Sequence, residues 1–220
     1  MLGQHIASRK VIGDWLKSEE TNGSRYSRDN IVVAKNSGQL ISGTVLGMLA
    51  VGAAMASLEV GNMGNGAIAA GAVGAGAQMG TYRITFTTAT AFTVTDPSGD
   101  TVGTGSVGTA FNTGGVAFTI TAGSTAFEAG DEGAVTIDPG SGKYVPFDPA
   151  GSGGAEVAAG ILVEDVDATS TTKDVAGAAV VRHAQIAPSG LTWKAGITDA
   201  QVSAALATLR GKGIFTVREA

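Results

Sequence analysis

The chain has 220 residues, no cysteine, and a formal net charge of −5 from 14 basic and 19 acidic side chains. Without cysteine it cannot form a disulfide framework or a thiolate metal site, and its acidic balance argues against nucleic-acid binding, because phosphate neutralisation needs clustered lysine and arginine. With 34 glycines and only 5% aromatic residues, the composition indicates a β- and loop-rich protein whose length permits one good core or two small ones.

Residues 1–20 are expected to form a flexible N-terminal arm. Their apolar side chains show neither a helical nor a strand period, and residues 1–35 carry six basic and four acidic side chains. Scattered apolar residues cannot compensate for the entropy of ordering unless a partner supplies contacts. Trp15 has two interpretations: an anchor that docks on a partner, or a local cap on the core.

Residues 21–60 are predicted to begin the main domain with short strands. Strand-like runs occur at Ile31–Val33 and Thr44–Leu46. The uncharged stretch 40–58 is nearly long enough to cross a bilayer. However, glycine, serine, threonine and alanine dilute it, and it lacks a flanking aromatic belt and a basic cluster. We therefore expect buried short strands here and no membrane span.

Residues 61–138 have a different chemistry, with a single basic residue against six acidic ones. The glycine- and alanine-rich stretch 61–80 predicts a linker or a loosely packed strand. Beyond it, Tyr82, Ile84 and Phe86 alternate with polar residues, and the same alternation recurs further along the segment. Several short strands separated by turns predict a small antiparallel β-sandwich, immunoglobulin-like in size.

Residues 139–220 are predicted to contain one helix between strands. Thr198 and Gln201 have the spacing of a capping box. One apolar stripe with helical spacing follows, formed by Val202, Ala205, Leu206 and Leu209. Gly211 or Gly213 should end the helix, and a last strand should follow at 214–218.

Motifs with chemical associations lack the surroundings that their chemistry needs. The GxGxxG run at Gly103–Gly108 opens no helix and lies in no βαβ unit. The SxxK run at Ser170–Lys173 has no partner motif of the serine acyl enzymes. His5 and His183 have no second ligand at metal spacing, and the acidic run 164–167 lacks the glycine-centred loop of an EF-hand. The sequence thus predicts no catalytic residue, no cofactor and no metal site.

Two segments resemble a known family. Leu191–Trp193, the helix after it and the terminal GIFTVRE are similar to the C-terminal half of lambda-like bacteriophage head decoration proteins. In members without an insertion, a strand like 43–46 leads almost directly to a segment like GKYVPFDP, found here at 142–149. The resemblance implies a mainly β protein with one or few short helices. Its decoration domain would comprise 21–60 and 139–220, interrupted by a small antiparallel β-sandwich insertion at 61–138.

The resemblance also implies a function. It predicts a structural virion protein and no enzyme: a homotrimer on the outer surface of the capsid head, seated at local three-fold positions, where it ties subunits of the major capsid protein together against the pressure of packaged DNA. By position alone, the capsid-binding candidates are Leu2, Ile6, Val11, Ile12 and Trp15. Whether the insertion binds a host-surface ligand is an open question at this point. So is an alternative function, in which the β module makes the protein a surface adhesin or carbohydrate-binding protein of phage-tail or bacterial origin.

Overall fold

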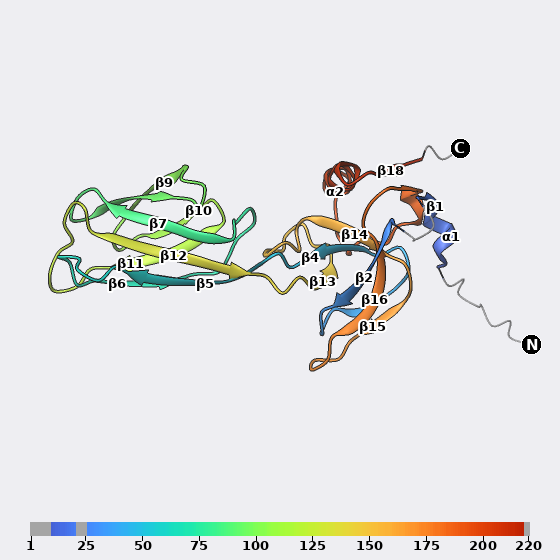
Figure 1. The fold of residues 1–220 in the computed structure, drawn as a ribbon, viewed down its shortest axis with the longest axis horizontal. Coiled ribbons are helices and arrows are strands. Elements are labelled where there is room, and N and C mark those ends of the chain that lie inside the picture. Colours follow the sequence, from blue (N-terminus) through green and yellow to red (C-terminus); the bar gives the residue numbers. More distant parts are fainter. Residues whose placement is uncertain (1–9, 21–25, 218–220) are drawn as a thin grey trace, which may run out of the picture. The chain divides into compact units, whose positions relative to one another are not determined.

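A computed structural model describes residues 10–20 and 26–217, and it divides the chain into two compact units. Unit 1 comprises Met1–Met48, Lys143–Ala150 and Ala155–Ala220, and unit 2 comprises Leu49–Gly142 and Gly151–Gly154. Strands make up 44% of the structure and helix 10% (Figure 1). The prediction of a mainly β protein with few short helices is confirmed.

Unit 1 is built around a closed barrel of five strands, in the order β13-β2-β16-β14-β4. A three-stranded sheet, β1-β17-β18, and a two-stranded pair, β15-β3, complete its β-structure. The elements are α1 (Ile12–Trp15), β1 (Leu16–Glu19), β2 (Arg28–Val33), β3 (Gly38–Leu40), β4 (Val45–Met48), β13 (Tyr144–Pro146), β14 (Ala158–Leu162), β15 (Val166–Ala168), β16 (Val175–Val180), β17 (Ala184–Ile186), the 3-10 turn η1 (Pro188–Gly190), α2 (Asp199–Gly211) and β18 (Ile214–Thr216).

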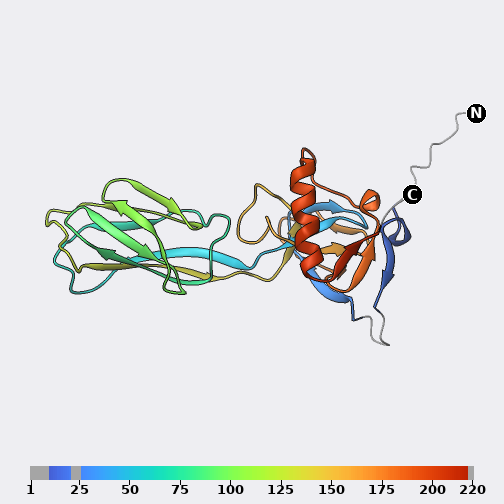
Figure 2. The same cartoon turned by 90° about the horizontal axis from the view of Figure 1, so that it is seen from above.

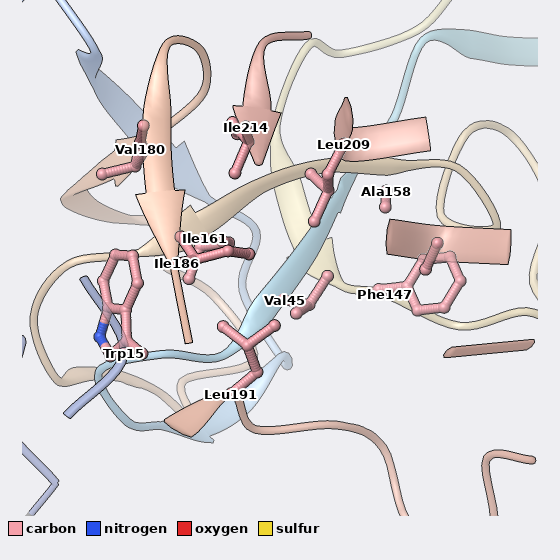
Figure 3. Packing of buried hydrophobic residues seen from close by; sticks show 12 residues of the cluster. Trp15, Val45, Phe147, Ala158, Ile161, Val180, Ile186, Leu191, Leu209 and Ile214 are labelled. Carbon is pink, nitrogen blue, oxygen red and sulfur yellow. The ribbon is translucent and has the colours of Figure 1, made fainter. Parts of the chain in front are cut away.

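The main core of unit 1 gathers side chains from both ends of the chain and from its middle. Figure 3 shows Trp15, Ile186 and Leu191 around Val45 and Ile161, all of them buried. A second cluster joins side chains of the barrel strands β2, β4, β14 and β16 with those of the pair β15-β3. The two flanks of the chain therefore share one hydrophobic interior, and neither flank can bury its apolar side chains without the other.

Helix α2 begins as the sequence predicts, because Thr198 accepts a hydrogen bond from the Gln201 backbone while the Gln201 side chain returns to the Thr198 N–H. Figure 2 shows the helix as a long red coil, and it packs beside β14 and β18. Ala205 and Leu209 are buried, whereas Leu206 is half-buried. Gly213, at φ 78°, follows the helix in the left-handed region that suits glycine.

Unit 2 consists of two antiparallel sheets, one of five strands in the order β5-β12-β7-β8-β9 and one of three in the order β10-β11-β6. Its core contains the apolar residues that alternate in the sequence, including Tyr82, Ile84, Phe86 and Phe118. The elements are β5 (Val51–Leu58), β6 (Ala67–Ala70), β7 (Gly80–Phe86), β8 (Ala91–Thr95), β9 (Thr101–Ser106), β10 (Ala110–Thr113), β11 (Val116–Thr121) and β12 (Glu132–Pro139).

The stretch 40–58 is divided between the two units. β4 closes the barrel of unit 1, whereas β5 pairs antiparallel with β12 and belongs to unit 2. The compact middle of the chain therefore starts at Leu49, earlier than the glycine-rich run at 61 where the sequence placed the insertion. The helices in the described ranges 10–20 and 26–217 are too short or too polar to span a membrane.

Candidate functional site

The beginning of the described chain is fixed to unit 1 by a lysine. The Lys10 ammonium donates to the Leu191 carbonyl and to the Thr192 hydroxyl, each at 3.0 Å. One turn of helix, α1, follows, and the Asp14 carboxylate accepts a hydrogen bond from the Val11 N–H at 2.9 Å. These contacts fix Lys10 and the turn that follows it to unit 1.

Trp15 lies at the end of α1 and is completely buried. Its indole N–H donates to the Ser42 hydroxyl at 3.0 Å, and that hydroxyl donates to the Val163 carbonyl at 2.8 Å. Two glycines make room for this residue, Gly43 for its ring and Gly190 for its backbone. A methyl group on Gly43 would lie 3.0 Å from the ring, and one on Gly190 would lie 2.8 Å from the Trp15 Cα. The indole is therefore both packed and hydrogen-bonded, as a buried tryptophan requires.

The next residues add a strand to unit 1. β1 pairs antiparallel with β17, and the Glu19 carboxylate forms an ion pair with the Arg28 guanidinium. Ser27 is buried, and its hydroxyl contacts the carbonyls of Glu20 and His183 at 3.0 and 2.8 Å. Residues 10–20 thus belong to the folded unit through backbone pairing, an ion pair and a buried hydroxyl.

The predicted site residues are consequently separated into three groups. Leu2 and Ile6 lie outside the described residues. Val11 is 55% exposed, and Ile12 packs partly against the core. Trp15 is buried within its own chain and belongs to the core cluster of unit 1, as expected of a local cap on the core. The sequence favoured a flexible arm up to residue 20 because the buried partners of Trp15 come from distant segments.

Carboxylate and lysine pairs lie on the surface of the barrel. Lys143 pairs with Asp174 at 2.7 Å, and the Lys35 N–H also donates to Asp174. The hydrogen bond from Lys143 lowers the pKa of Asp174, and a hydrogen bond from Lys194 likewise lowers the pKa of Asp148. A depression of about 390 Å³ lies between these pairs. Asp148 and Lys194 in its wall are paired with each other, which suits a stable surface better than an acid or a base catalyst.

The glycine and serine motifs have structural explanations. Gly105 lies in β9, where a side-chain carbon would come within 2.4 Å of the Phe92 ring. Gly105 therefore leaves room for an aromatic side chain, whereas Gly108 has a φ of 83°, which suits glycine. Ser170 accepts hydrogen bonds from the backbone N–H groups of Thr172 and Lys173 at 3.3 and 3.1 Å, which closes a turn.

The acidic run at 164–167 is also used locally. Asp165 accepts a hydrogen bond from the Ser42 N–H, and Asp167 accepts two from Thr169. Within residues 10–20 and 26–217, no three histidine, aspartate or glutamate side chains gather closely enough to hold a metal ion.

An exposed aromatic group near the ends of β16 and β18 did not emerge from the sequence. Tyr26 and Phe215 are 51% and 52% exposed, and the His183 ring stacks on Tyr26 with centroids 5.3 Å apart. The alternation in β18 could have indicated Phe215, because Ile214 faces the core and the next residue of a strand faces away from it. The pairing of Tyr26 with His183 joins residues far apart in sequence and had no local signal.

Comparisons with known proteins identify one family. The family model described as "Bacteriophage lambda head decoration protein D" matches residues 6–214. No protein with a curated description matches the chain.

Solved structures with partial similarity come from bacterial flagella. Xanthomonas campestris FlgL is 24% identical over 46% of this chain and 33% of its own length, with a TM-score of 0.33. The flagellar hook junction protein FlgK from Burkholderia pseudomallei is 22% identical over 58% of this chain and 24% of its own length, with a TM-score of 0.34. The chain thus spans about a third or less of these flagellar proteins, and likeness at this level does not extend to function.

Proposed function

Because the chain belongs to the family of bacteriophage lambda head decoration protein D, we propose that it forms a homotrimer at local three-fold positions of the phage head and stabilises the shell against packaged DNA. As a member of this family it is a structural phage protein located on the exterior of the capsid. The observation that carries the proposal is the extent of the family match, which runs through both flanks of the chain.

The proposed role requires repeated contacts and no chemistry. A trimer presents each contact three times, and the second and third contacts form at high effective concentration once the first has formed. Weak individual contacts can therefore add up to firm attachment. The folded unit 1, which carries the surface ion pairs Lys143–Asp174 and Lys194–Asp148, is consistent with such a passive structural element.

The shell contact is assigned to the beginning of the chain. Val11 is exposed beside the point where Lys10 is fixed to unit 1. Leu2 and Ile6 precede it in the sequence. In this proposal, the residues up to Val11 contact the capsid, while Ile12 and Trp15 hold the base of the segment in the core.

Unit 2 is proposed to be an inserted module that is dispensable for attachment. The Gly142 N–H donates to the Leu49 carbonyl at 2.9 Å, so the chain enters and leaves this unit at adjacent positions. Its core also consists of its own side chains. Replacing residues 50–141 with a short glycine-serine link should therefore leave a soluble trimer that binds the shell. A monomeric or insoluble product would show that the module is part of the decoration fold.

Co-sedimentation with expanded shells of the major capsid protein from the same phage tests the attachment. The wild-type protein should sediment with the shells, and a variant lacking residues 2–9 should stay in solution while keeping its trimeric mass. Lys173→Ala, a change in an exposed turn, provides the control and should bind as wild type. Full binding of the truncated variant would exclude the beginning of the chain as the contact. A monomeric mass of the wild type would exclude the trimer.

A further inference from the structure

Three exposed side chains and one partly exposed arginine form a group at the end of the sheet β1-β17-β18 where β17 begins. The rings of Tyr26 and His183 stack, and the Arg182 guanidinium lies 5.3 Å from the centre of the Tyr26 ring. Arg182 is held in place by Asp29 at 2.6 Å and by the Tyr26 carbonyl. Phe215 is the fourth member and lines the same depression as His183. We call this group the aromatic patch.

His183 has a backbone conformation that is unfavourable for histidine. Its φ of 47° lies in the left-handed region, which glycine and asparagine adopt more readily than histidine. Hydrogen bonds impose this conformation: the His183 carbonyl accepts from the Ser27 hydroxyl at 2.8 Å and from the Glu20 N–H at 3.1 Å. The backbone alone would therefore favour glycine here, whereas the imidazole ring projects toward solvent.

The patch has the features of a preorganised protein-binding surface. Tyrosine, arginine and other aromatic residues are enriched at the energetic centres of protein interfaces. The ring stack and the Asp29 ion pair fix these side chains before any partner arrives, which lowers the entropy lost on binding. Beside the patch is an open depression of about 280 Å³, lined by Glu20 on β1's side and by His183 and Phe215 on the other.

The depression has a definite chemical preference. Phe215 offers an apolar wall, while the exposed Glu20 carboxylate offers a negative charge 3.9 Å from the His183 ring. A lysine or arginine side chain matches both, because its aliphatic stem can cover the ring while its cationic head meets the carboxylate. A polar uncharged side chain would leave the Glu20 carboxylate without a counter-charge, and an acidic side chain would be repelled by it.

The beginning and the end of the described chain meet unit 1 at the end of β17 opposite to His183. The Trp15 carbonyl accepts from the Ala187 N–H at 2.7 Å, and the Val217 N–H donates to the Ile186 carbonyl at 2.8 Å. β17 has only three residues, so His183 is within about 13 Å of this point at roughly 3.3 Å per residue. A capsid surface that contacts the chain at this point reaches the patch if it extends about 13 Å along β17.

We propose that the aromatic patch is a second contact with the capsid shell, in which the depression receives a lysine or arginine side chain of a capsid subunit. This inference rests on the proposed attachment through the beginning of the chain. It differs from that attachment in its residues, so the two can be tested separately.

The test compares full-length variants in the same shell-binding experiment, titrated to obtain a dissociation constant. His183→Gly removes the ring and suits the left-handed backbone, and Phe215→Ser removes the apolar wall. Each should keep the wild-type mass and weaken binding about tenfold or more. Glu20→Gln should also weaken binding, with a smaller dependence on salt than the wild type shows. Val157→Ser, which changes an exposed apolar residue on another segment, is the matched control and should bind as wild type.

The outcomes separate the two proposals. If the wild type binds and both His183→Gly and Phe215→Ser bind with the same affinity, the proposed role of the patch is overturned and the attachment proposal stands. Loss of the trimer in these variants would assign the patch to contacts between copies of the chain, which also overturns it. If His183→Gly melts early, Phe215→Ser decides, because that side chain is half exposed and outside the core. Absence of wild-type binding would overturn the attachment and the patch together.

Discussion

The two units achieve their stability in different ways. Unit 1 relies on specific ties between distant segments: Lys10 with Leu191, Trp15 with Ser42, and Ser27 with the His183 carbonyl. Unit 2 has a core rich in phenylalanine rings that come from neighbouring strands. Phe86 stacks on Phe127 with centroids 4.1 Å apart, and the other phenylalanine rings pack nearby.

This difference concerns how each unit depends on the rest of the chain. The residues of unit 2 follow one another in sequence, apart from four residues at 151–154, so most of its contacts form within one segment. Unit 1 requires residues from the beginning, the middle and the end of the chain. Contacts at large sequence separation need costly loop closure first. Unit 1 should therefore be the unit that loses most when a single distant tie is removed.

The strongest test of that expectation is Trp15→Ala. Removing a fully buried tryptophan should lower the stability of unit 1 by about 3 to 5 kcal/mol, and the Ser42 hydroxyl would also lose a donor. Calorimetry should show the transition of unit 1 moving down while that of unit 2 stays in place. Val11→Ala, at an exposed neighbour, should change little. Equal shifts of all transitions would mean that the two units unfold cooperatively.

A second test uses the interior of α2. Leu209→Ala should destabilise unit 1 by about 2 to 5 kcal/mol, because the side chain is completely buried. Leu206→Ala should cost about 1 to 2 kcal/mol, since Leu206 is half-buried and loses less apolar contact. Lys212→Ala should have almost no effect. Thermal melts of the three variants measure this order, and equal midpoints for Leu209 and Leu206 would contradict the observed burial.

A third test addresses the main buried charge of unit 2. Burial acts to raise the pKa of Asp131, but hydrogen bonds from the backbone of Gly64, Met63 and Glu128 outweigh it and hold the pKa below its ordinary value. The ionised carboxylate therefore stabilises unit 2 above the ordinary aspartate pKa of about 3.9, and this contribution is lost as the pH falls through the lower folded-state pKa.

Asp131→Asn should remove that pH dependence. At pH 7 the variant should melt below the wild type, because an amide offers one acceptor oxygen where the carboxylate offers two for the loop at 63–64. The gap should narrow toward pH 3. Asp100→Asn, at an exposed site with the same change in charge, is the control. A gap that stays constant with pH would show that Asp131 acts through packing alone.

The smallest expected effect concerns the ion pair on the outer face of unit 2. Arg83 and Glu132 are 3.0 Å apart, with 64% and 39% of their side chains exposed. Exposed pairs contribute about 0 to 1 kcal/mol, and salt screens them. Arg83→Ala should therefore shift the melting temperature of unit 2 very little, and by less still in 1 M salt. A large shift would indicate that Arg83 contributes through packing across the strands.

The strands of unit 2 could be predicted because their signal is local. In β7, Tyr82, Ile84 and Phe86 point inward and their neighbours outward, so the sequence period of two is also the burial pattern. The start of helix α2 could be predicted equally well from its capping box. The apolar stripe did not distinguish the half-buried Leu206 from the fully buried Leu209, because a stripe identifies the inward face of a helix but does not say how far the neighbouring strands cover it.

The place where the N-terminal segment packs on unit 1 could not be predicted in the same way. Trp15 has few apolar neighbours in sequence, and its partners come from Ser42, Val163 and Gly190. Likewise β5 looks like a continuation of β4, and only its pairing with β12 assigns it to the middle of the chain. Such assignments depend on contacts between distant residues, which periodicity does not report. The aromatic patch at His183 was not predicted for the same reason.

The close fit of Trp15 between Gly43 and Gly190 has a mechanical consequence. Neither glycine has room for a side-chain carbon, because Gly43 lies against the indole ring and Gly190 against the backbone of Asp14 and Trp15. Trp15 is therefore held in a tight slot by its ring and by its backbone. A tensile force applied to the residues before Lys10 would meet this ring as a stop that cannot slide. The segment could then leave only if the slot opened, a process that couples to loss of the core. Under load, attachment should fail where the protein meets its partner before the chain peels away from unit 1.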